Sequence, residues 1–303
     1  MKKATAILTA DLHLRETAPI ARTDNFVTAQ ISKLKFIKEL AEKHECPTFI
    51  AGDIFDKAKS SPFVEAMALS HFPKETFVIP GNHCLPSHNL NNFDKSSLRV
   101  LEAAKTITAL TNTDTFDFLT FTVTGFPFGT TFTPKYVGTS FNEKVPHIAL
   151  LHLMIHKDKP IHESIESTKA LSLLKNSSYD LIVVGDNHTP FTVEHEGRLL
   201  VNCGALTRIT AGQIDYKPAV WLWYADTNTV EKVYLPIEKG VISREHIEKK
   251  DKKDKRMEAF IERVDTSYEL GIDFPMNVES YFRKNVTRKG IKEIIRKSME
   301  EDA

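Results

Sequence analysis

The sequence of 303 residues contains few cysteines and no long apolar run. Its three cysteines, Cys46, Cys84 and Cys203, form neither an even framework nor a C-x-x-C pair, which argues against a disulfide scaffold and suits a reducing compartment. The longest apolar stretches, such as Ile148–Leu151, are far shorter than the roughly 18 to 20 residues of a membrane span. The N-terminal segment lacks the apolar core of a signal peptide. We therefore expect a cytoplasmic protein with no membrane partner.

The sequence also lacks an excess of charge of either sign, with 40 Lys plus Arg against 40 Asp plus Glu. No global field attracts nucleic acid, so any binding of DNA requires a local patch, a metal ion or a partner. Glycine and proline are sparse, at 12 and 14 residues, and 41% of the residues are hydrophobic, which excludes collagen-like repeats and disorder. A chain of this length can bury a core without a structural metal or disulfide.

Short β-rich runs alternate with helical patterns in the first part of the chain. From Asp24 to His44 the apolar residues recur at steps of three and four, which predicts a helix with one buried face. Strands are predicted at Ala4–Thr9, Thr48–Ala51, Thr76–Ile79, His147–Leu151 and Asp180–Val184. This alternation indicates an α/β domain, which we place at residues 1–236.

Four short alternating segments follow with no helical pattern between them, and they predict a meander. These segments are Phe191–His195, Leu199–Asn202, Ala219–Tyr224 and Thr229–Leu235. Residues 237–303 are rich in charge and are predicted to be mostly helical. A helix is expected over Ser243–Val264, and Leu270–Met276, Val278–Val286 and Thr287–Met299 are expected to supply two short amphipathic helices.

Polar side chains stand where five of the predicted strands end. They are Asp11 with His13, Asp53 with Asp56, Asn82 with His83, His152, and Asp186 with His188. The carboxyl ends of strands in an α/β sheet are where sites are built. Carboxylate, imidazole and amide oxygen together suit manganese, iron or zinc, whereas magnesium favours oxygen alone and structural zinc favours cysteine. The sequence therefore predicts a divalent metal centre.

These five blocks resemble the motifs of the calcineurin-like metallophosphoesterases, which are D-x-H, G-D-x-x-D, G-N-H-D/E, a lone His and G-H-x-H. Their order and spacing are similar to those of the nuclease subunit of SbcCD-type DNA repair complexes, and Val201–Arg208 resembles that group's P-G-S-x-x-R segment. The resemblance implies a two-sheet α/β/β/α sandwich with a small helical C-terminal appendage. It also implies a two-metal hydrolase, most simply manganese-dependent, that acts as a DNA exonuclease or endonuclease in repair or recombination.

The resemblance also implies roles for single residues. One metal ion is assigned to Asp11, His13, Asp53 and His188, and the second to Asp53, Asn82, His152 and Asp186. His83 is the implied general acid, because a histidine can protonate the leaving oxygen near neutral pH. The chain departs from the family pattern twice, with Asp186 in place of a histidine and Cys84 in place of a carboxylate beside His83.

The implied partners are DNA and an SbcC-like, SMC-type ATPase subunit bound to the C-terminal region, with a homodimer left open. Two alternatives to a nuclease remain. The first is a free-standing phosphoesterase for a small nucleotide or a phosphoprotein, and the second is a non-catalytic scaffold in which Asp186 and Cys84 mark lost function. Asp56 is left open between a structural turn and the site. The Phe-rich stretch Phe116–Phe132 is expected in the core, with a base-stacking platform as the alternative.

Overall fold

The computed structural model describes residues 2–136, 145–160, 162, 164–267 and 274–301. The chain divides into two units, Met1–Ser243 and Arg244–Ala303. The sequence predicts a boundary at Pro236, and the first unit extends beyond it to a β-bridge between Arg22 and Ile242.

The first sheet of this unit contains six strands in the order β14-β13-β1-β2-β3-β4. Their bounds are β1 Ala6–Thr9, β2 Thr48–Ile50, β3 Thr76–Val78, β4 Thr108–Ala109, β13 Ala219–Tyr224 and β14 Thr229–Tyr234. Strands β1 to β4 are parallel, and β13 and β14 extend the sheet in antiparallel fashion beside β1. The carboxyl ends of β1, β2 and β3 therefore lie side by side at one edge of the sheet.

The second sheet also contains six strands, in the order β11-β12-β10-β7-β6-β5. Their bounds are β5 Thr115–Asp117, β6 Thr122–Phe126, β7 His147–His152, β10 Leu181–Gly185, β11 Phe191–His195 and β12 Arg198–Asn202. Strands β6, β7, β10 and β12 are parallel, and β5 and β11 are antiparallel edge strands. Strands β8 (Ile155–His156) and β9 (Thr168–Lys169) form a separate small pair.

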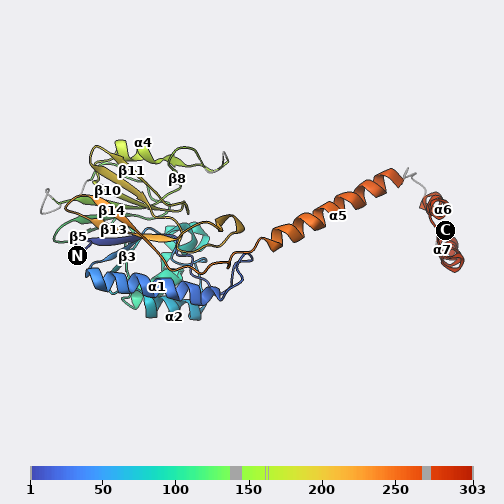
Figure 1. The fold of residues 1–303 in the computed structure, drawn as a ribbon, viewed down its shortest axis with the longest axis horizontal. Coiled ribbons are helices and arrows are strands. Elements are labelled where there is room, and N and C mark those ends of the chain that lie inside the picture. Colours follow the sequence, from blue (N-terminus) through green and yellow to red (C-terminus); the bar gives the residue numbers. More distant parts are fainter. Residues whose placement is uncertain (1, 137–144, 161, 163, 268–273, 302–303) are drawn as a thin grey trace. The chain divides into compact units, whose positions relative to one another are not determined.

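Helices cover the outer face of each sheet (Figure 1). Helices α1 (Phe26–His44), α2 (Pro62–His71) and α3 (Ser97–Ala103) pack on the first sheet, and α4 (Ala170–Lys175) packs on the second. The side chains along each inner strand alternate between the other sheet and the covering helices. In β7, Ile148 and Leu150 face the first sheet, whereas Ala149 and Leu151 face α4. The predicted two-sheet α/β/β/α sandwich is confirmed.

The predicted helix from Asp24 to His44 is confirmed as α1. The side chain of Asn25 accepts a hydrogen bond from the amide of Thr28 and caps the first turn. Leu34, Ile37 and Ala41 are buried against the sheet, as their spacing predicts. The helix ends where Glu45 adopts a left-handed conformation, with φ of 53°.

The predicted meander is wrong. Strands β11 and β12 form a hairpin in the second sheet, whereas β13 and β14 form a hairpin in the first. Residues 203–218 carry the chain from one sheet to the other. A half-buried antiparallel strand has the same alternating pattern in either sheet, so the pattern alone does not reveal the crossing.

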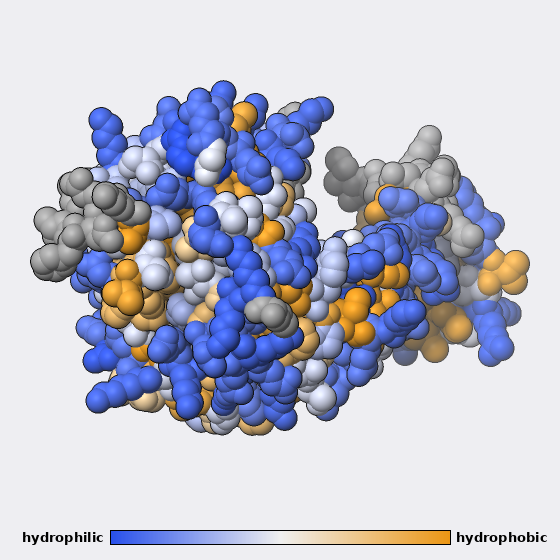
Figure 2. All heavy atoms as spheres, turned by 60° about the vertical axis from the view of Figure 1, so that its left-hand side comes forward, coloured by the Kyte–Doolittle hydropathy of each residue, from blue (hydrophilic) through white to orange (hydrophobic). Residues whose placement is uncertain are grey.

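The second unit contains α5 (Glu245–Ser267), α6 (Phe274–Lys284) and α7 (Lys289–Glu301). Arg296 of α7 donates two hydrogen bonds to the Glu279 carboxylate of α6, at 2.5 and 2.8 Å. Part of the predicted segment Leu270–Met276 lies outside the described residues. None of the helices in the described chain combines the length and apolar character that crossing a membrane requires. Exposed apolar side chains are dispersed over the largely hydrophilic face drawn in Figure 2.

Candidate metal centre

The two sheets bring their polar strand ends to one place. Asp11, Asp53 and Asn82 follow β1, β2 and β3, whereas His152 ends β7 and Asp186 follows β10. The sheets are joined directly here, because the amide of Asp186 donates to both carboxylate oxygens of Asp11, at 3.1 and 3.0 Å. Side chains that are widely separated in the sequence therefore form one cluster.

The first part of the cluster is rich in nitrogen. The Nε2 atoms of His13 and His188 lie 3.1 Å apart, and His13 Nε2 lies 3.8 Å from Asp53 Oδ2. Within the described residues, Asp11, His13 and His188 place one ligand atom each within 4.8 Å of one another. The four residues assigned to the first metal ion are thus brought together.

The second part of the cluster is rich in oxygen and surrounds His152. A carbonyl oxygen can only accept, so the 2.8 Å contact with Ala51 O fixes the proton of His152 on Nδ1. The other nitrogen, Nε2, faces Asn82 Oδ1 at 3.0 Å, Asp53 Oδ2 at 3.4 Å and Asp186 Oδ1 at 3.8 Å. The residues assigned to the second metal ion therefore also converge, with Asp186 the most distant.

Burial and neighbouring charge shift the pKa values of these groups. Burial raises the pKa of Asp11 to about 8 and lowers the pKa of His13 to about 3. At Asp53 the effect of burial is outweighed by the His152 imidazole, and the pKa of the carboxyl falls below its usual value. Burial likewise acts against a charged His152, but the Asp53 carboxylate raises the pKa of that imidazole to about 10. The oxygens around His152 Nε2 thus favour a positive charge at this position.

The cluster fits divalent metal ions. The buried carboxylates of Asp11 and Asp53 and the half-buried carboxylate of Asp186 supply negative charge that needs compensation. When His152 is neutral, the lone pair of its Nε2 and the oxygens facing it repel one another unless a metal cation binds among them. Carboxylate, amide and imidazole donors suit manganese, iron or zinc. All three cysteines are free thiols.

The sequence model of the calcineurin-like phosphoesterase family matches residues 4–190, which include all of this cluster. The chain belongs to this family. Calcineurin-like phosphoesterases hydrolyse phosphoester bonds and use divalent metal ions, in agreement with the donor set described above. None of the curated proteins matches the sequence.

Several solved structures resemble the chain at low sequence identity. The protein TT1561 of Thermus thermophilus is 13% identical with a TM-score of 0.47, and the match covers 78% of this chain and 100% of that one. An archaeal phosphodiesterase is 12% identical with a TM-score of 0.41, and the match covers 76% and 99%. A metallophosphoesterase from Sphaerobacter thermophilus is 11% identical with a TM-score of 0.37, and the match covers 77% and 89%.

His83 lies beside the cluster and is held from two sides. Its ring Nδ1 donates to the carbonyl oxygen of Asp56 at 2.9 Å, and its amide donates to Asp53 Oδ1 at 3.0 Å. The ring meets that of His13 edge-on, with centroids 4.9 Å apart. These contacts direct the other nitrogen of His83, Nε2, away from the Asp56 carbonyl, and one ligand atom each of His13, Asp53 and His83 lies within 4.8 Å of the others.

The side chains of Cys84 and Asp56 are not the groups that hold His83. Cys84 is fully buried, and burial raises the pKa of its thiol to about 12, so it supplies no charge to His83. The Asp56 carboxylate accepts a hydrogen bond from Arg15 at 3.0 Å. The backbone carbonyl of Asp56 is the group that orients His83. A backbone carbonyl has no residue signature, so sequence patterns could not identify it.

Two glycines allow the cluster to close. Gly52 has a φ of 95°, and a Cβ atom there would lie 2.1 Å from His152 Nδ1. A Cβ atom on Gly81 would lie 2.2 Å from Asp53 Oδ1. These positions require glycine because a side chain would displace His152 or Asp53.

An open cleft of about 740 Å³ adjoins the oxygen-rich side of the cluster. His152 and Asp186 form part of its wall, and Phe126, Phe128 and Phe132 line it further along. The two parts of the Phe-rich stretch Phe116–Phe132 therefore lie in different environments. Its first part, Phe116–Phe121, packs with core rings such as Phe49 and Phe77, as expected, whereas its last part lines a cleft beside the cluster.

Proposed function

We propose that this calcineurin-like phosphoesterase is a manganese-dependent phosphodiesterase that hydrolyses DNA. The observation that carries the proposal is the phenylalanine-lined cleft, which shares His152 and Asp186 with the metal centre. A phosphate at the centre would place the attached nucleoside in this cleft, where Phe128 offers a ring for stacking. Stacking on an aromatic side chain contributes about 1 to 3 kcal/mol per base and tolerates any sequence.

The ligand residues follow from the two donor sets. Asp11, His13, Asp53 and His188 would hold one ion, and Asp53, Asn82, His152 and Asp186 would hold the other, with Asp53 common to both sets. When bound, two divalent ions neutralise phosphate oxygens and lower the pKa of a water molecule towards neutrality. The Ala51 carbonyl keeps the proton of His152 on Nδ1 and so keeps Nε2 available as a ligand.

His83 performs the proton transfer in this proposal. Its Nδ1–H bond to the Asp56 carbonyl fixes the orientation of the ring and leaves Nε2 as the nitrogen that can meet the substrate. Nε2 then donates a proton to the oxygen of the departing nucleoside. Proton transfer of this kind typically contributes about 10²- to 10⁴-fold to the rate.

The C-terminal helices supply the basis for a partner. Phe274 of α6 and Ile291 and Ile294 of α7 expose 68%, 47% and 70% of their surface. Exposed apolar side chains on amphipathic helices are suited to bind another helix. We include an SbcC-like ATPase in the proposal as the partner of this region, which would make the chain the nuclease subunit of a DNA repair complex.

The decisive experiment measures manganese-dependent degradation of end-labelled DNA with and without the ATPase subunit. Asp53→Ala should abolish cleavage and binding of both metal ions, whereas Asp117→Ala, at an exposed position in β5, should leave both unchanged. Cleavage of bis-p-nitrophenyl phosphate but not DNA, with no effect of the ATPase, would instead support a small-nucleotide phosphoesterase. Fewer than two bound ions and no hydrolysis with any divalent ion would support the scaffold.

A further inference from the structure

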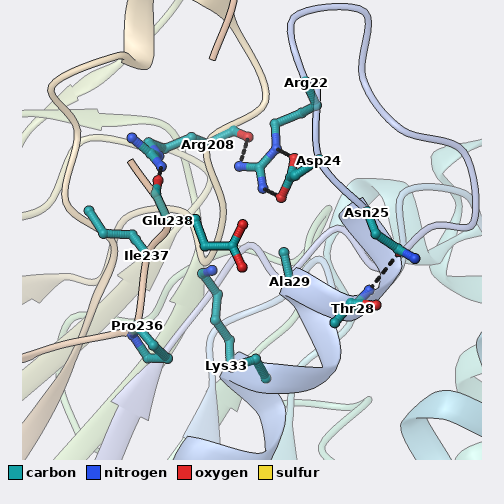
Figure 3. A pocket seen from close by; sticks show the side chains of 11 residues that line it. Arg22, Asp24, Asn25, Thr28, Ala29, Lys33, Arg208, Pro236, Ile237 and Glu238 are labelled. Carbon is teal, nitrogen blue, oxygen red and sulfur yellow. Dashed lines mark hydrogen bonds and ion pairs between the residues drawn. The ribbon is translucent and has the colours of Figure 1, made fainter. Parts of the chain in front are cut away.

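A second polar cavity lies beside the amino-terminal turns of α1 (Figure 3). It has a volume of about 310 Å³ and is walled by α1, by the loop that precedes it, and by residues 208 and 236–238. None of its lining residues belongs to the metal centre. Three cationic side chains line it, Arg22, Lys33 and Arg208, together with the carboxylates of Asp24 and Glu238.

One of the three cations is already neutralised. Arg22 forms a two-pronged pair with Asp24, with N–O distances of 2.8 and 2.5 Å. A further nitrogen of Arg22 donates to the carbonyl oxygen of Arg208 at 3.2 Å. The Arg22–Asp24 pair is therefore a fixed, nearly neutral wall of the cavity, and the remaining charges are the cations Lys33 and Arg208 and the carboxylate of Glu238.

Arg208 is buried but incompletely paired. It is 5% exposed, and its terminal nitrogens donate to backbone carbonyl oxygens of Ile214 at 3.2 Å and Glu238 at 2.6 Å. Its Nε atom is buried and has no hydrogen-bond partner among the described residues. Both bonds go to neutral carbonyls, so no carboxylate directly compensates the charge of the guanidinium.

Lys33 is the least satisfied of the three. It is 3% exposed, and its ammonium group forms no hydrogen bond or ion pair within the described part of the chain. In Figure 3 its side chain rises from α1 towards the Glu238 carboxylate, without an interaction drawn between them. Burial, together with the neighbouring charges of Arg22 and Arg208, lowers the pKa of Lys33 to about 8. A buried cation without a bonded anion is costly.

We infer that this cavity binds a phosphate-class anion between Lys33 and Arg208. Such an anion would give the Lys33 ammonium the acceptor oxygens that it lacks, and the charge of the Arg208 guanidinium in the cavity wall would add to the attraction. The positive end of the α1 dipole acts in the same sense. A water molecule takes up roughly 30 Å³ in the liquid, so the cavity has room for a phosphate group with several waters.

The cavity is linked to the metal centre through two sets of backbone contacts. Gln30, one turn from Lys33 on α1, accepts from the amide of Arg15 at 3.0 Å and donates to its carbonyl at 2.8 Å. The amide of Leu206, close to Arg208, donates to the carbonyl of Asp11 at 3.1 Å. The anion therefore binds on the two segments that support the loop carrying Asp11 and His13. Its source is either free phosphate or a second phosphate of a bound DNA strand.

The test is isothermal titration of the full chain with inorganic phosphate in the presence of a chelator. The chelator removes phosphate binding through metal ions, so the result does not depend on the proposed hydrolysis. Lys33→Met keeps the length of the side chain and should weaken phosphate binding at least about tenfold. Lys35→Met, at an exposed position on the same helix, should bind phosphate like the unchanged protein.

Glu238→Gln should change the phosphate affinity in the opposite direction to Lys33→Met. Glu238 is exposed, so the change should not disturb folding, and removing its carboxylate should tighten phosphate binding several-fold. Lys33→Met should also raise the melting temperature in phosphate-free buffer, since it removes a buried, unpaired charge. No binding by the unchanged protein, or equal binding by all variants, overturns the inference.

A parallel titration with a phosphorothioate oligonucleotide distinguishes the two sources. If the phosphate belongs to the strand, Lys33→Met weakens oligonucleotide binding in parallel with phosphate binding. If the anion is free phosphate, oligonucleotide affinity stays constant while phosphate affinity falls. Either result supports an anion site at Lys33, and each assigns it to one source.

Discussion

Replacing His83 by glutamine separates two roles that its position allows. His83, His13 and Asp53 each place a potential ligand atom within 4.8 Å of the others, so a ligand role is geometrically open. The 2.9 Å bond from Nδ1 to the Asp56 carbonyl favours the role of proton donor. If His83 is the proton donor, His83→Gln should lower kcat on DNA about 10²- to 10⁴-fold, which corresponds to an activation free energy higher by about 3 to 5 kcal/mol. It should retain both metal ions, because the ligand sets described above do not include it.

The leaving group provides the sharper assay. The alkoxide that leaves DNA needs a proton, whereas p-nitrophenolate leaves readily without one. The loss in kcat for His83→Gln should therefore be much smaller with bis-p-nitrophenyl phosphate than with DNA, while metal analysis finds two ions per chain. His71→Gln, at the end of α2, is the control for a histidine outside the cluster. Equal losses on both substrates, or a variant lacking one metal ion, would refute the reasoning.

Three further changes test other parts of the site. Gly52→Ala should lower the free energy of unfolding in urea by more than about 2 kcal/mol, because the strain of a positive φ adds to a Cβ contact of 2.1 Å with His152. Gly197→Ala is the control, because Gly197 has a φ of 76° and a Cβ atom there would meet no atom within 4 Å, so only the strain remains. Equal losses of stability in the two variants would contradict the clash. Phe128→Ala should raise the KM for an oligonucleotide about tenfold with little change in kcat, and an unchanged KM would exclude stacking in the cleft. Asp186→His should shift the metal preference in activity titrations from manganese towards zinc, and a variant inactive with every metal would show that Asp186 has another role.

The strand ends could be predicted because their residues carry their own signal. Short buried strands end at or just before these ligands, and parallel strands bring their carboxyl ends to one edge. The ligands are Asp11, Asp53, Asn82, His152 and His188. The convergence of two sheets on one cluster follows from the sandwich, which the resemblance implied. Geometry that depends on side-chain type and strand direction was therefore accessible from the sequence.

Features that depend on backbone groups or on contacts between distant segments could not be predicted from the sequence. The carbonyl of Asp56 orients His83 and the carbonyl of Ala51 orients His152, yet every residue has a carbonyl. The cavity near Lys33 depends on Arg208, which belongs to the segment that crosses between the sheets. Since the alternating pattern does not reveal that crossing, it could not place Arg208 beside α1.

The backbone of the metal centre explains why its ligands stay in unfavourable conformations. Asp11, His13 and Asp53 have φ values of 50°, 45° and 49°, which cost about 1 kcal/mol or more each for residues with a side chain. The loops after β1 and β2 continue to bond to each other beyond the sheet, from Asp11 N to Gly52 O at 3.1 Å and from His13 N to Asp53 O at 2.9 Å. Each strained residue is thus fixed by its neighbour on the adjoining loop. Because these bonds join the two loops that carry Asp11 and Asp53, a backbone shift at one of these ligands is transmitted to the other.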